Sequence, residues 1–170
     1  MNPNIRALAA TLLFSAAGLW SVFFRAAPWN FLLPHLLFYM VLVFNTYFSV
    51  RFYSGITPDT TFQFLIDGAL VVSNLALALT IGLPLPFAVC AVVLFTIAPA
   101  KYAHMLGQTP HVKTLRKKIL IDLLGAIMSS SVMILTLFGY DSEAAWTLAI
   151  LFGLANVYLL AINPMYRLID

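Results

Sequence analysis

The chain has 170 residues, of which 62% are apolar and 9% are charged, and its formal net charge is +3. Soluble domains are about 45–50% apolar and about 25% charged, so this composition excludes a water-soluble protein and favours a lipid bilayer as the surroundings. The basic residues lie near the ends of apolar segments rather than in one block, and no nucleic-acid partner is expected. The single cysteine, Cys90, excludes an intramolecular disulfide framework.

Six apolar segments are long enough to cross a bilayer as helices, since a spanning helix needs about 20 mostly apolar residues. In chain order they are residues 5–24, 31–52, 62–83, 85–105, 118–138 and 144–162. Turn-forming residues separate them, for example Ala27-Pro28, Thr57-Pro58 and Gly139. We therefore predict a single all-helical membrane domain over residues 1–170, a six-helix up-and-down bundle of three consecutive hairpins with no soluble domain.

The basic residues predict how this bundle is oriented. With the N-terminus in the cytoplasm, eight of the nine lie on the cytoplasmic side and only Arg25 lies outside, as the positive-inside rule requires. The tryptophans Trp20, Trp29 and Trp146 then fall at the outer interface, where amphipathic rings are favoured. We expect both termini to be cytoplasmic and the membrane to be the inner (plasma) membrane of a bacterium.

Two prolines bear on where the spans end. Pro99 lies inside the fourth span and is predicted to kink or end that helix about one turn before the cytoplasmic surface. The Asn163-Pro164 pair is predicted to close the sixth span at a similar depth.

Asp67 and Asp122 are the only carboxylates within the spans, and ionisable groups at membrane depth are costly enough to mark functional sites. They lie 55 residues apart in similar stretches, FLID and ILID, and the polar residues Asn74 and Ser129 follow them after seven positions. Because seven residues make two helical turns, each pair shares one helix face. A parallel repeat of the kind some transporters use and a chance similarity both account for the match.

The two carboxylates differ in their local partners. Lys118 precedes Asp122 by four residues on the same face, so a local ion pair is expected there. Asp67 has no basic residue at helical spacing, and its partner must be another span, water or a proton. A structural ion pair and an ion or proton site are both open for Asp67, and the cations available on the cytoplasmic side are Arg51, Lys101 and Arg167.

The other polar residues near the spans have structural explanations of their own. Amides within spans are predicted to join helices through hydrogen bonds, and they are Asn45, Asn156 and Asn163. His104, at the cytoplasmic end of the fourth span, could approach both carboxylates, although an interfacial histidine is the ordinary explanation. Basic residues before the fifth span enforce topology or contact anionic headgroups, and they are Lys113, Arg116 and Lys117. Nothing indicates a cofactor, and we predict no metal site.

Three functional classes follow from these residues. We favour a small transporter or channel-like protein with ion, proton or substrate sites at Asp67, Asn74, Asp122, Ser129 and His104. The alternative is a non-catalytic structural subunit or assembly factor of a larger membrane complex. A third class is a lipid-modifying enzyme at the cytoplasmic face, using His104 and the carboxylates. The expected partners are the bilayer with its anionic lipids, and either further copies of this chain or other membrane proteins.

Overall fold

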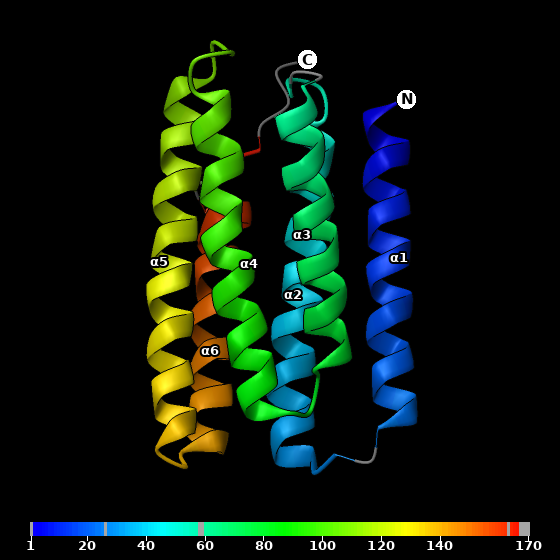
Figure 1. Ribbon diagram of the computed structural model, residues 1–170, viewed down its shortest axis with the longest axis vertical. Helices are drawn as coiled ribbons and strands as arrows, with labels where there is room; N and C mark the ends of the chain where they lie inside the picture. The colour runs from blue at the N-terminus through cyan, green and yellow to red at the C-terminus, as the bar shows by residue number, and fades with distance from the viewer. Residues whose placement is uncertain (1, 26, 58–59, 163, 167–170) are drawn as a thin grey trace.

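Six long helices make up the computed structural model, which describes residues 2–25, 27–57, 60–162 and 164–166 (Figure 1). A π-helical turn, η1 (Tyr158–Ile162), extends the last helix, and with it each of the six is long and apolar enough to cross a membrane. No strand occurs in the described part of the chain, so the predicted all-helical class is confirmed. The helices are α1 (Pro3–Phe24), α2 (Trp29–Tyr53), α3 (Thr61–Leu79), α4 (Pro84–Met105), α5 (Val112–Leu137) and α6 (Asp141–Val157).

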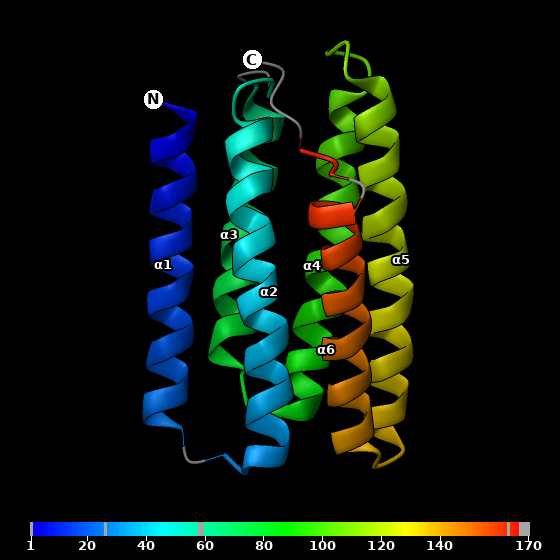
Figure 2. The ribbon, with the colours of Figure 1, turned by 180° about the vertical axis from the view of Figure 1, so that it is seen from behind.

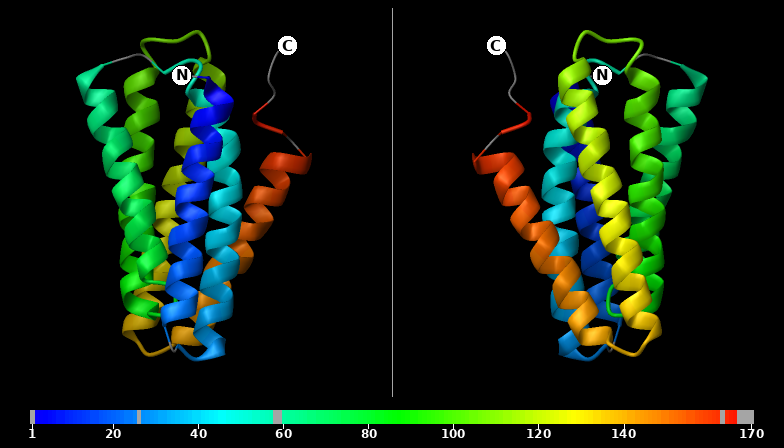
Figure 3. Two further views of the ribbon diagram at one scale, coloured as in Figure 1. Left: turned by 90° about the vertical axis from the view of Figure 1, so that its right-hand side faces the viewer. Right: turned by 90° about the vertical axis from the view of Figure 1, so that its left-hand side faces the viewer.

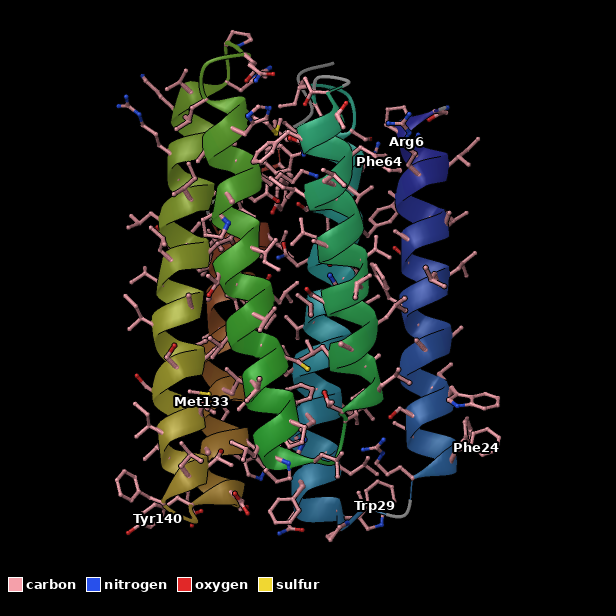
Figure 4. All side chains as sticks on the ribbon, in the orientation of Figure 1. Arg6, Phe24, Trp29, Phe64, Met133 and Tyr140 are labelled. Carbon is pink, nitrogen blue, oxygen red and sulfur yellow. The ribbon has the colours of Figure 1, made fainter. Side chains whose placement is uncertain are left out.

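Successive helices run in opposite directions, so α1, α3 and α5 begin at the end of the bundle where α2 and α4 finish (Figure 1). This end carries Arg6, Arg51, Lys101 and the basic residues at the start of α5, and we call it the basic end. The opposite end carries Arg25 and the exposed Trp29, which is labelled there in Figure 4. Basic residues and tryptophans therefore separate along the bundle axis as the sequence predicts.

The helices pack as a ring in which neighbours in sequence are not always neighbours in space. α2 lies against α1 and α6, α4 lies against α3 and α5, and α5 lies against α6 (Figure 2). α1 also contacts α3, but the two helices diverge toward the basic end, where α6 leans away from the bundle (Figure 3). The consecutive helices α2 and α3 barely touch each other.

The half of the bundle near the opposite end is filled by close packing of rings and small residues. The buried His35 ring stacks on Phe87 with centroids 4.1 Å apart, and its Nδ1 accepts a hydrogen bond of 3.1 Å from the backbone N–H of Gly82. Gly82 adopts a positive φ of 86° in the turn between α3 and α4, a conformation that favours glycine. On the α1 side, Gly18 lies against the Tyr39 ring, and a Cβ at Gly18 would come within 2.7 Å of it.

Helix boundaries differ most from the prediction at the end of the third span and at the start of the fifth. α3 ends at Leu79 rather than at 83, because the chain turns at Gly82. α5 begins at Val112 rather than at 118, so the basic stretch before the fifth span is already helical. α4 continues through Pro99 to Met105, the predicted end of the fourth span, because Tyr102 and Met105 are buried against Leu115 of α5; a helix end at Pro99 is therefore excluded. The predicted closure at Asn163 lies outside the described residues, as does Arg167.

Candidate functional site

A cavity of about 740 Å³ occupies the basic half of the bundle, between α2, α3 and α4, with α1 and α5 completing its wall. This volume lies within the range of about 300–1,000 Å³ that small-molecule sites span. Its polar lining comes from all five helices and the loop between α2 and α3, and comprises Arg6, Asn45, Thr46, Ser49, Ser54, Thr57, Thr60, Thr61, Gln63, Asp67, Asn74, Lys101, Tyr102, Lys118 and Asp122.

The inner part of the cavity is mainly apolar. Each apolar residue there lies nine to eleven positions from the basic end of its helix, which is about 15 Å along the axis at 1.5 Å per residue. The cavity is therefore polar toward the basic end and mainly apolar farther in, except for Asn74, which lies thirteen positions from the start of α3. The apolar inner residues are Phe14, Leu42, Leu70, Val71, Leu94 and Phe95.

One ion pair lies deep in the wall formed by α5. Lys118 Nζ is 2.6 Å from Asp122 Oδ1, four residues apart on one helix face, and both side chains are buried. The predicted local pair is thus confirmed. Lys118 Nζ also lies 5.5 Å from the centroid of the Tyr102 ring, a cation–π distance. The second carboxylate oxygen of Asp122, Oδ2, is buried without a hydrogen-bond partner.

A second ion pair joins α3 to α4 across the cavity wall. Lys101 Nζ is 2.7 Å from Asp67 Oδ1, so Lys101, one of the three cations that the sequence offers, pairs with Asp67; Arg167 lies outside the described residues. The Asp67 side chain is 43% exposed, whereas that of Lys101 is 13% exposed. Gln63, one turn earlier on α3, donates a hydrogen bond of 3.2 Å from Nε2 to the same carboxylate oxygen. Asp67 therefore presents an accessible carboxylate whose position is fixed by two donors.

Two buried amides complete the α3 side of the cavity. Asn74 donates from Nδ2 to the Leu70 carbonyl at 2.8 Å, and its Oδ1 has no partner. Gln63 Oε1 is likewise buried without a partner. Unpaired buried polar atoms are costly, and both oxygens are buried in the wall rather than open to the cavity.

The structure brings Asp67, Asn74 and Asp122 to one cavity, but not the other two proposed site residues. Ser129 is buried on α5 and is not among the residues that line the cavity. His104, at the end of α4, is also absent from that lining. Its Nε2 lies 3.1 Å from Gln108 Nε2 and 3.4 Å from Thr60 Oγ1, and its ring packs against Phe62.

The amides predicted to join helices behave differently from one another. Asn45 lines the cavity and accepts a hydrogen bond of 3.3 Å from the hydroxyl of Tyr166, which ties α2 to the segment after η1. Asn156 donates only to the Phe152 carbonyl of its own helix, at 2.8 Å, and its Oδ1 has no partner. The predicted bond from Asn156 to another helix is therefore not formed within the described residues, and Asn163 lies outside them.

The basic residues at the start of α5 lie at the basic end, outside the cavity. Lys113 and Arg116 are exposed and Lys117 is half-buried, a placement that suits the predicted contact with anionic headgroups. Within the described chain, no group of three or more His, Cys, Asp or Glu side chains is arranged to hold a metal ion.

The polar face of α2 is part of the cavity lining and was not predicted from the sequence. Thr46 and Ser49 line the cavity beside Asn45, and Ser49 Oγ is 3.1 Å from the hydroxyl of Tyr102 on α4. The four-residue spacing of Asn45 and Ser49 could have indicated this polar face, because it places both residues on one side of a helix.

Comparisons with known proteins add no relative from which a function could be carried over. No protein-family model matches the sequence, and no curated protein and no solved structure matches it.

Proposed function

We propose that the protein is a small membrane transporter, in which the cavity at the basic end is the substrate site and Asp67 and Asp122 form the ion or proton site. The observation that carries this proposal is the placement of both intramembrane carboxylates in the lining of one cavity of about 740 Å³. Carboxylates inside a membrane bundle are characteristic of ion pathways and proton relays.

The two halves of the bundle support a carrier rather than an open channel. The cavity occupies the basic half, and the stacked His35 and Phe87 rings and the Gly18–Tyr39 contact fill the other half. A site that is reached from one side at a time is the arrangement that alternating access requires. The positive-inside rule places the basic end in the cytoplasm, and the proposed membrane is the plasma membrane of a bacterium.

The two rival classes receive less support from the site. A non-catalytic subunit needs no polar cavity, and its polar residues serve only as packing contacts between helices. A lipid-modifying enzyme needs an acid–base group, but His104 is held by Thr60, Phe62 and Gln108 at the end of α4 and does not line the cavity with the carboxylates.

The test is ion flux into liposomes that contain the purified protein. A potassium diffusion potential drives uptake, an internal pH dye reports protons, and a radioactive tracer reports sodium ions. We expect protein-dependent uptake of one of the two ions, and we expect Asp67→Asn to reduce it to the level of protein-free liposomes. The matched control is Glu143→Gln, the same loss of a carboxylate at an exposed position of the opposite end.

If neither ion enters faster than in protein-free liposomes, the proposed ion or proton site is rejected. If Asp67→Asn transports normally and is equally abundant in the membrane, Asp67 has no part in transport. Gentle extraction followed by native mass spectrometry addresses the main rival, since a stable complex with other polypeptides would favour a structural subunit.

A further inference from the structure

The charges in the lining of the cavity do not balance. Among its described residues the lining holds three cations and two carboxylates, which are Arg6, Lys101, Lys118, Asp67 and Asp122. Two ion pairs, of 2.7 and 2.6 Å, match both carboxylates with the two lysines. Arg6 is exposed and forms no ion pair with another described residue. The cavity therefore offers one positive charge without a partner, which favours a bound molecule with one negative charge.

The cavity opens sideways between α1 and α3. Its exposed lining residues all lie on α1, on α3 or directly before α3, and among the described residues none lies on α2, α4 or α5. Val71, which is 38% exposed, comes ten residues after the start of α3, about 15 Å along the helix axis. The opening thus reaches the level of the lipid chains in a bundle that spans a bilayer. The exposed lining residues are Arg6, Thr60, Thr61, Phe64 and Val71.

The two helices beside the opening change from charged to apolar along their length. Arg6, Ala10 and Phe14 follow one another at four-residue spacing on one face of α1, and Phe14 lies about 12 Å farther in than Arg6. Phe64 and Val71 share a face of α3 at seven-residue spacing. α1 and α3 diverge toward the basic end (Figure 3), where Figure 4 shows Arg6 and Phe64 at a similar level. A molecule between them would meet a cation at the basic end and apolar side chains farther in.

We propose that the substrate is a single-chain amphipathic anion, a molecule with one alkyl chain and one negatively charged head group, which enters from the bilayer between α1 and α3. Its head group binds the Arg6 guanidinium, whose N–H groups can donate to a carboxylate or to a phosphate. Its chain lies along Ala10, Phe14 and Leu70. The volume of about 740 Å³ is that of a site for one small molecule, in agreement with a single chain. This inference rests on the proposed function in taking the cavity as the substrate site.

The experiment measures binding of radiolabelled probes to the protein in phosphatidylcholine nanodiscs, with binding to empty nanodiscs subtracted. Dodecanoate, dodecyl methyl phosphate and dodecyltrimethylammonium share one chain and differ in the head group, and acetate has the carboxylate without the chain. A mildly alkaline pH keeps the carboxylates ionised. We expect at least one of the two dodecyl anions to bind, dodecyltrimethylammonium to bind at least about tenfold more weakly, and acetate not to bind. The tighter anion identifies the head group as a carboxylate or a phosphate.

Arg6 and Arg51 provide a matched pair of variants for the head group. Both lie at the basic end, but only Arg6 is among the residues that line the cavity. We expect Arg6→Gln to weaken binding of the tighter dodecyl anion by about tenfold, because a charge-assisted hydrogen bond is lost. We expect Arg51→Gln to leave this binding unchanged, which controls for the loss of one positive charge at the same end.

Ala9 and Ala10 provide a second matched pair, for the alkyl chain. Ala10 lines the cavity, whereas its neighbour Ala9 is exposed and does not. Leucine at position 10 adds apolar volume where the chain is expected to lie, so we expect Ala10→Leu to weaken binding of the dodecyl anion by at least about tenfold. Ala9→Leu adds the same volume outside the cavity, and we expect it to bind the anion as the wild type does.

Four results would overturn the inference. Neither dodecyl anion binds, dodecyltrimethylammonium binds as tightly as the anions, acetate binds as tightly as dodecanoate, or both members of a matched pair have the same effect on binding. The last result would place the head group or the chain outside the cavity. Binding without ion flux would retain the amphipathic anion as the ligand of the cavity while the ion or proton site fails, and ion flux without binding would do the reverse. The two proposals can therefore be separated.

Discussion

The two ion pairs of the cavity wall have almost the same length, 2.6 Å for Lys118–Asp122 and 2.7 Å for Lys101–Asp67, but their surroundings differ. The first lies within one helix with both side chains buried, whereas the second joins two helices and includes a carboxylate that is 43% exposed. The comparison teaches that burial, rather than distance, decides how strongly the fold depends on an ion pair.

The physical reason is the free energy of removing a charge from water. A buried charge that loses its partner keeps its desolvation cost and has nothing to offset it, which destabilises a protein by about 3–5 kcal/mol. An exposed charge that loses its partner is solvated again, and the loss is about 0–1 kcal/mol. The substitutions below should therefore separate the two pairs by their effects on stability.

Lys118→Met should have the largest effect, because it leaves the Asp122 carboxylate buried without its cation. We expect the free energy of unfolding to fall by about 3–5 kcal/mol, measured as a lower apparent melting temperature of the purified protein in detergent. If Lys118→Met lowers the melting temperature no more than Lys101→Met does, burial does not decide how strongly the fold depends on an ion pair.

Removing both members of the buried pair should restore most of that loss. In Lys118→Met combined with Asp122→Leu, no charge is left unpaired, and such replacements are often neutral or stabilising. We expect a melting temperature close to that of the wild type, together with loss of the proposed ion flux. A double variant as unstable as Lys118→Met would mean that the pair itself stabilises the fold.

Lys101→Met should have a smaller effect than Lys118→Met, because Asp67 can be solvated through the cavity. We expect a loss of about 1 kcal/mol or less, seen as a small decrease in the same melting temperature. The link between α3 and α4 is also removed, so protease cleavage in the loop between α2 and α3 should become faster. Unchanged cleavage would show that the pair does not restrain α3.

Asp67→Asn should have the smallest effect on stability. The asparagine Oδ1 can still accept hydrogen bonds from both Lys101 Nζ and Gln63 Nε2, so the mostly buried Lys101 keeps a partner and we expect a change of about 0.5 kcal/mol or less. Membrane abundance, measured by quantitative blotting, should match the wild type. Strongly reduced abundance would assign Asp67 a structural role in place of the proposed site.

The sequence is sufficient for the parts of this molecule that depend on local spacing. Apolar length predicts the six spans, and the four-residue separation of Lys118 and Asp122 predicts their pair, because both signals lie within one helix. α3 ends early because residues 80–82 already form the turn that contains Gly82, and hydropathy alone does not show where that turn begins. The passage of α4 through Pro99 depends on burial of the following residues against another helix.

Features that depend on which helices become neighbours could not be predicted. Three cations were available to Asp67, and only the packing of α3 against α4 selects Lys101. His104 was equally able to approach the carboxylates by depth, but it lies on the side of α4 that faces Phe62 and Thr60. The cavity itself exists because α2 and α3 barely touch, which no periodicity in either segment indicates.

The contact of Phe95 with Gly125 has a mechanical consequence. The Phe95 ring lies directly on the glycine, where a Cβ would come within 2.8 Å, and α4 and α5 form the most extensive helix contact of the bundle. The two helices therefore form one closely packed unit that carries Lys101, Lys118 and Asp122, whereas Asp67 belongs to α3. A motion that separated α3 from this unit would break the Lys101–Asp67 bond and leave the Lys118–Asp122 bond intact, because only the first of the two joins α3 to α4.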